Sequence, residues 1–116
     1  MYEVFAYAET TPIELESAYP YKAVDGTCRA KGGEVEDNSY VNVAVNSRAA
    51  FLQALQTGPL SIAIEADQYV FQFYNGGVLN SSRCGTRTDH GVLAVGYGGS
   101  GDSTYYIVKN SWGASW

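Results

Sequence analysis

The chain has 116 residues, and its 46% hydrophobic and 16% charged composition excludes a disordered chain and fits one small core. A net charge of −5 and a pI near 4.6 argue against nucleic acid or an anionic membrane surface as a partner. No apolar run approaches the roughly 20 residues of a membrane span, and the acidic, aromatic start lacks the basic residues of a signal peptide.

The first part of the chain contains two segments with a regular pattern. Residues 1–9 are predicted to form a short helix, because apolar side chains recur there at helical spacing and Pro12 prevents its continuation. Residues 13–31 have no sustained period, so we expect irregular structure. Residues 39–45 carry a valine at every second position, which predicts a strand.

The middle of the chain predicts a helix followed by short strands. Residues 47–57 have a helical pattern, and Ser47 can cap the helix. Residues 60–64 alternate between aliphatic and small side chains, as a strand does. An aromatic segment at 69–74 and a brief strand at 78–79 are expected to follow.

The last part of the chain predicts a β-hairpin. The strand-like runs 90–98 and 104–113 are joined by a short Gly/Ser loop. The start of one antiparallel strand lies beside the end of its partner, so His90 and Asn110 should meet at one edge. With Trp112 two residues further on, these side chains are a candidate catalytic group.

Each of these residues also has a simpler interpretation. A lone histidine is usually a surface or satisfied core residue, and Trp112 alone would more often belong to a core. Asp89 is a candidate general acid, although a solvated turn residue before the strand is the favoured interpretation. The sequence has one histidine and no paired Cys/His cluster, so we expect no metal ion and no other cofactor.

Two four-residue segments carry a resemblance to a known family: Asp89-His90-Gly91-Val92 and Asn110-Ser111-Trp112-Gly113. They resemble the His and Asn segments of the papain-like, cathepsin L-like cysteine peptidases. Other segments agree in order and spacing: Tyr19-Pro20-Tyr21, Gly58-Pro59-Leu60-Ser61-Ile62-Ala63, Tyr74-Asn75-Gly76-Gly77-Val78 and Val95-Gly96-Tyr97-Gly98. The resemblance implies an α+β papain-like fold, mainly its antiparallel β-barrel half with short flanking helices. Residues 1–116 would then be a partial peptidase domain, truncated at both ends.

The resemblance also implies a nucleophile that this sequence lacks. In the family, the reactive cysteine lies in a Cys-Gly-x-Cys-Trp-like segment upstream of the histidine, with an oxyanion-hole glutamine before it. Neither Cys28 nor Cys84 has that context. By position, each resembles one half of a family disulfide whose partner lies outside this sequence. Asn80-Ser81-Ser82 is a glycosylation acceptor, which agrees with an oxidising compartment.

The resemblance assigns roles to the residues of the hairpin. His90 would stabilise a thiolate as its imidazolium and then donate a proton to the leaving amine. Asn110 would accept a hydrogen bond from the other ring nitrogen and fix the orientation of the ring. Trp112 would support the site by covering that bond and excluding water from it.

Substrate contacts and partners follow from the same resemblance. Met1, Ala63 and Gly91 match positions of the apolar pocket for the side chain before the scissile residue. Two of them are small, so the pocket should admit Leu, Phe or Tyr. The implied partners are a polypeptide substrate, the missing N-terminal half of the domain, and protein inhibitors or a propeptide. The implied location of the parent protein is lysosomal, vacuolar or extracellular.

Three functional hypotheses result from the sequence. The first is the His- and Asn-bearing fragment of a cysteine endopeptidase, inactive alone because the nucleophile is missing. The alternative is a non-catalytic pseudo-peptidase that serves as a binding module, and the retention of His90, Asn110 and Trp112 argues against it. The third is an unrelated β-rich domain, which the agreement of several segments makes remote.

Overall fold

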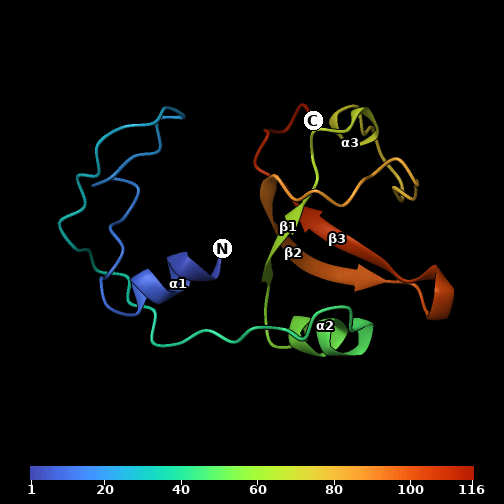
Figure 1. The fold of residues 1–116 in the computed structure, drawn as a ribbon, viewed down its shortest axis with the longest axis horizontal. Coiled ribbons are helices and arrows are strands. Elements are labelled where there is room, and N and C mark those ends of the chain that lie inside the picture. Colours follow the sequence, from blue (N-terminus) through green and yellow to red (C-terminus); the bar gives the residue numbers. More distant parts are fainter. The chain divides into compact units, whose positions relative to one another are not determined.

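The computed structural model describes residues 1–116. The chain forms two compact units, Met1–Asn42 and Val43–Trp116, coloured from blue to green and from green to red in Figure 1. Every helix in the chain is too short or too polar to cross a bilayer.

The first unit contains one helix and a loop that is closed by a two-residue bridge. Helix α1 (Tyr2–Ala8) confirms the helix predicted at the start of the chain. The Phe5 ring stacks on that of Tyr40, with centroids 5.9 Å apart. The backbone groups of Ile13 and Val35 exchange hydrogen bonds of 2.8 and 3.1 Å. The bridge encloses the irregular segment that the sequence predicts at residues 13–31.

Two of the predicted strands are absent, and the predictions were wrong for a common reason. Residues 39–45 contain no strand, and the alternating Val41 and Val45 side chains are exposed. Residues 78–79 lie in a loop that follows Gly76 and Gly77, both of which have positive φ. A strand is stable only where a neighbouring strand supplies hydrogen bonds, and neither segment has such a neighbour.

The second unit begins with a helix that packs on the predicted hairpin. Helix α2 (Arg48–Leu55) is capped as expected, with the Ser47 hydroxyl oxygen accepting a 3.2 Å hydrogen bond from the Ala50 N–H. The Phe51 ring meets the Tyr106 ring edge-on, with centroids 4.9 Å apart. The helix therefore covers the hairpin through an aromatic contact.

The sheet of the second unit has three antiparallel strands in the order β1-β2-β3 (Figure 1). They are β1 (Leu60–Ile64), β2 (His90–Gly98) and β3 (Tyr105–Lys109), which confirms the predicted strand at 60–64 and the hairpin. Val92 and Ala94 of the central strand are buried, because β2 lies between β1 and β3 and these two side chains share one face of the sheet.

The hairpin contains a bulge close to its middle. Ala94 pairs with Val108, but the next pair joins Gly96 to Ile107, so β2 carries one extra residue at this point. The turn between the strands includes a short 3₁₀ helix, η1 (Gly101–Ser103). Bulges of this kind change the direction of a strand and the side chains that it presents.

Candidate active site

The hairpin brings His90 and Asn110 into contact. His90 is the first residue of β2, and Asn110 directly follows β3. The pairing of Leu93 with Lys109 puts Asn110 opposite Val92, on the face of the sheet that His90 shares. The Nε2 atom of His90 lies 2.8 Å from the Oδ1 atom of Asn110, so the predicted juxtaposition is present.

The hydrogen bonds of Asn110 identify the tautomer of the histidine. The same Oδ1 atom accepts a 2.8 Å hydrogen bond from the backbone N–H of Ser111. An atom that accepts this bond is the carbonyl oxygen of the amide, so His90 must donate through Nε2. The Nδ1 atom of the neutral ring is therefore left with a free lone pair.

The amide group of Asn110 also has a buried donor without a partner. Its Nδ2 atom has no hydrogen-bond acceptor and is shielded from solvent. An unsatisfied buried donor costs about 1–3 kcal/mol. The side chain keeps this orientation because its oxygen accepts hydrogen bonds from two donors. In the opposite orientation both donors would face the NH₂ group of the amide and would be unsatisfied.

Trp112 covers one side of the histidine. Its ring centroid lies 5.1 Å from that of His90, with 31° between the planes. The indole is 38% exposed, so one part of it faces solvent while another part covers the imidazole. A hydrogen bond that is shielded from water is electrostatically stronger than an exposed one.

Two further aromatic residues hold Trp112 in place. Helix α3 (Tyr69–Gln72) supplies Phe71, and the end of the chain supplies Trp116. Their rings meet Trp112 edge-on, at centroid distances of 5.5 and 5.4 Å. The indole N–H of Trp116 is shared between the carbonyl oxygens of Phe71 and Gln72, at 3.3 and 3.1 Å. Figure 1 shows α3 beside the C-terminus. No pattern in the sequence predicts either of these supporting residues.

Asp89 has a structural role at the start of β2. Its Oδ1 atom accepts a 2.8 Å hydrogen bond from the Ala66 N–H. Its own backbone N–H donates to the Ile64 carbonyl oxygen at 2.9 Å. The residue therefore joins the end of β1 to the start of β2 and fixes the position of His90.

Glu65 organises the loop that precedes Asp89. Its carboxylate accepts hydrogen bonds from the Arg87 backbone N–H and the Gln68 side chain. These donors, the Arg87 N–H foremost, lower the pKa of Glu65 below its ordinary value of 4.5. Gly85 has a φ of +71° and lies so close to the carboxylate that a Cβ atom there would overlap it. The loop is therefore built around a negative charge.

Two of the three predicted substrate-pocket residues are neighbours. Ala63 of β1 and Gly91 of β2 are direct partners in the sheet, and both are exposed on its surface. Together they leave a part of the sheet without large side chains. Met1 belongs to the first unit, where it lies at the N-cap of α1.

The remaining predicted site residues lie apart from the histidine contact. Cys28 and Cys84 are both unbonded, the first exposed and the second half-buried. Asn80 is exposed in a loop. No three His, Cys, Asp or Glu side chains gather in a way that could hold a metal ion.

Comparison with protein families matches residues 1–116 to the model described as "Papain family cysteine protease". The chain belongs to the papain family. It is 49% identical over 109 residues to the cysteine endopeptidase Rep1 of Oryza sativa subsp. japonica, which covers 90% of this chain and 29% of Rep1. The family assignment therefore concerns about a third of the length of such a relative.

Solved structures of the family share the fold. The cysteine protease CMS1MS2 of Carica candamarcensis, in complex with E-64, superposes with a TM-score of 0.81 at 35% identity. The alignment covers 97% of this chain and 52% of that protease. The digestive procathepsin L 3 of Tenebrio molitor gives a TM-score of 0.83 at 37% identity, over 97% of this chain and 38% of the other. The papain-like fold class expected from the sequence is confirmed.

Proposed function

We propose that this chain supplies the histidine and the asparagine of a Cys-His-Asn peptidase site. The observation that carries the proposal is the Asn110 oxygen, which accepts from both the His90 ring and the Ser111 backbone. A doubly bound acceptor holds the imidazole with Nε2 protonated and Nδ1 free. The free nitrogen is the atom that a nucleophile would contact.

The nucleophile would come from a part of the protein outside residues 1–116. Transfer of the thiol proton to Nδ1 of His90 gives a thiolate–imidazolium pair. The thiolate attacks the carbonyl carbon of the peptide, and the C–N bond breaks as the imidazolium gives its proton to the amine. Water, deprotonated by the same ring, then cleaves the thioester and restores the thiol.

The surrounding residues support this chemistry without taking part in bond changes. Asn110 acts by positioning the ring, and an amide suffices because the thiolate already balances the imidazolium charge. Trp112 shields their hydrogen bond and is braced by Phe71 and Trp116. We infer that the polypeptide substrate lies across Ala63 and Gly91, whose exposed surface leaves space for a large apolar side chain. The role of Met1 in substrate binding stays a prediction.

The parent protein would work in an oxidising compartment, which we propose to be lysosomal, vacuolar or extracellular. Cys28 and Cys84 are not bonded to each other, and we propose that each pairs with a cysteine outside residues 1–116. Asn80 is exposed and available to carry a glycan. Protein inhibitors or a propeptide would cover the same surface as the substrate.

Two experiments test the proposal. The 116-residue chain should not hydrolyse a fluorogenic dipeptidyl amide, because neither of its thiols lies in the sequence context of a nucleophile. Turnover that disappears in Cys84→Ala would contradict this. In the longer parent, His90→Ala should lower kcat by at least about 100-fold while the fold survives. A parent without a thiol at the nucleophile position would instead be the non-catalytic binding module.

A further inference from the structure

The loop after α3 contains the one Asn-Gly pair of the chain, Asn75-Gly76, which the peptidase chemistry does not use. Asparagine is thermolabile, because the carbon of its side-chain amide can be attacked by the backbone nitrogen of the next residue. A side chain on that next residue obstructs the attack, and glycine has none. The pair is therefore a candidate for a chemical change that needs no enzyme.

The fold leaves both reacting groups of this pair accessible. Asn75 is exposed, and the chain bends after it, with φ of +138° at Gly76 and +76° at Gly77. No atom lies within 4 Å of the place where a Cβ atom of Gly76 would stand. The Gly76 N–H donates no hydrogen bond to the backbone. The nitrogen is therefore free to meet the amide carbon of Asn75.

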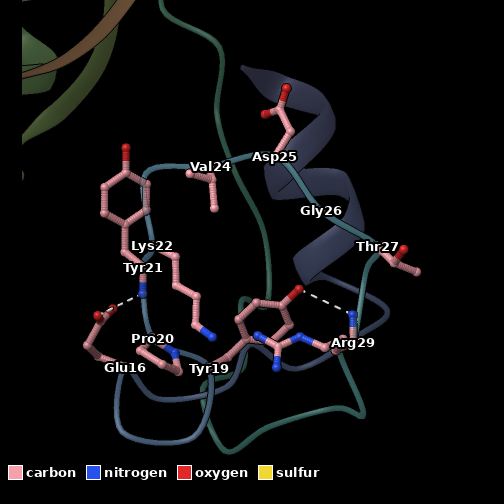
Figure 2. Close-up of a pocket in the computed structure, with 10 residues that line it drawn as sticks. All are labelled: Glu16, Tyr19, Pro20, Tyr21, Lys22, Val24, Asp25, Gly26, Thr27 and Arg29. Atoms are coloured by element: carbon pink, nitrogen blue, oxygen red, sulfur yellow. Dashed lines mark hydrogen bonds between the residues drawn. The ribbon is translucent and has the colours of Figure 1, made fainter.

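A second pair in the chain has the same open surroundings but a poorer leaving group. Asp25-Gly26 lies in the first unit, where Figure 2 shows the Asp25 side chain extended from the loop. No atom lies within 4 Å of the Cβ position of Gly26 either. An ionised carboxylate resists attack by a nucleophilic nitrogen, whereas the neutral amide of Asn75 releases ammonia. Near neutral pH the comparison favours Asn75.

The asparagines that precede a serine are less suited to the reaction. They are Asn38, Asn46, Asn80 and Asn110. The Cβ atom of the serine obstructs the attack at each of them. Asn110 is held in addition by its Oδ1 atom, which accepts hydrogen bonds from His90 and Ser111. Sequence and fold therefore both single out Asn75.

We propose that Asn75 is a site of spontaneous succinimide formation. The Gly76 nitrogen attacks Cγ of Asn75, and the new C–N bond forms as the bond from Cγ to the side-chain nitrogen breaks. The proton lost by the Gly76 nitrogen leaves with that group as ammonia. Water then opens the ring at either carbonyl and gives aspartate or isoaspartate. Both products add a negative charge, and isoaspartate also adds a CH₂ group to the main chain.

Aromatic contacts connect this position to the residue that covers His90. The Tyr74 hydroxyl donates a 2.6 Å hydrogen bond to the Gly77 carbonyl oxygen, so this bond spans the reacting pair. The Tyr74 ring lies 5.6 Å from that of Trp116, which in turn contacts Trp112. A longer main chain between Tyr74 and Gly77 breaks the hydrogen bond. Isoaspartate at Asn75 therefore loosens the support of Trp112.

The test is prolonged incubation of the 116-residue chain near neutral pH, followed by peptide mapping and by labelling with an isoaspartyl methyltransferase. Asn75 should convert before Asp25 and before every asparagine that precedes a serine. Its rate should be about the same in the folded chain and in urea, whereas Asn110 should react faster in urea. Asn75→Gln is the matched control, because its longer side chain disfavours the five-membered ring, and it should remove most of the isoaspartate.

Tryptophan fluorescence tests the connection to the aromatic residues. Both tryptophans of the chain, Trp112 and Trp116, belong to this group. Their emission should change as the unmodified chain ages and stay constant in Asn75→Gln. The proposal is overturned if Asn75 persists in the folded chain while it converts in urea, or if Asn46 or Asn80 converts first. Conversion of Asn75 with unchanged emission would refute the effect on Trp112.

Discussion

Nε2 of His90 and Oδ1 of Asn110 are 2.8 Å apart, although the two residues are separated by 20 positions in the sequence. The hairpin brings them together, and the Ser111 N–H identifies the oxygen end of the amide. The geometry therefore specifies which ring nitrogen carries the proton, which can be measured without any catalytic assay.

Replacing Asn110 by alanine should change the tautomer of His90. In the unmodified chain at a pH where the imidazole is neutral, ¹⁵N spectra should show the proton mainly on Nε2. Asn110→Ala removes the acceptor, so the spectra should move toward an equilibrium between both tautomers. Asn80→Ala, at an exposed position, is the matched control. A proton on Nδ1 in the unmodified chain would refute the assignment.

Trp112→Ala should destabilise the second unit by about 2–3 kcal/mol, less than the ~3–5 kcal/mol for a fully buried aromatic residue. The reason is that the indole is 38% exposed but contacts three other rings. Urea unfolding followed by Trp116 fluorescence reports on this unit. Tyr69→Ala, also in the second unit but mostly exposed, should cost much less. Equal losses for the two variants would show that the Trp112 contacts contribute little.

Ser47→Ala should destabilise α2 by about 1 kcal/mol, because the Ala50 N–H would lose its side-chain acceptor. Circular dichroism during thermal unfolding gives the loss of stability. Ser115→Ala removes a hydroxyl from an exposed residue near the end of the chain and serves as the control. The cap assignment fails if both variants unfold at the temperature of the unmodified chain.

The lowered pKa of Glu65 predicts a loss of stability in acid. Folding favours the ionised carboxylate, so its contribution is fully present above the ordinary value of 4.5 and disappears as the pH falls through the lowered pKa. The thermal midpoint of Glu65→Gln should therefore fall less than that of the unmodified chain between pH 5 and about 3. Asp102→Asn should retain the original acid dependence. An identical profile for Glu65→Gln would contradict the role of the carboxylate.

The sequence predicts those elements whose stability depends on local patterns or on adjacent segments. Ser47 marks a helix start, and the apolar alternation of β1 and β2 marks strands that pair with each other. Hairpin geometry predicts that His90 and Asn110 meet at one edge, and the bulge in β2 puts both side chains on the same face. The roles of these residues in peptide hydrolysis, and those of Met1, Ala63 and Gly91, stay predictions.

The failures concern interactions between distant segments. The valines of residues 39–45 alternate as in a strand, but no partner strand pairs with them. The contact of Phe71 with Trp116 joins residues that are 45 positions apart in the sequence, and no periodicity links them. Nothing in the sequence around Asp89 indicates that its side chain will accept a hydrogen bond from the backbone N–H of Ala66.

The extra residue of β2 determines which changes of length the hairpin tolerates. If the pairing of Gly96 with Ile107 continued without interruption, Asn110 would stand opposite Leu93 and point to the reverse side of the sheet from His90. Lengthening the turn at Gly101–Ser103 leaves the pairing of Val92 with Asn110 intact, whereas moving Val95 into the ladder opposite Val108 would break it. The distance along the chain between the imidazole and the amide can therefore vary, provided that Val95 stays outside the ladder.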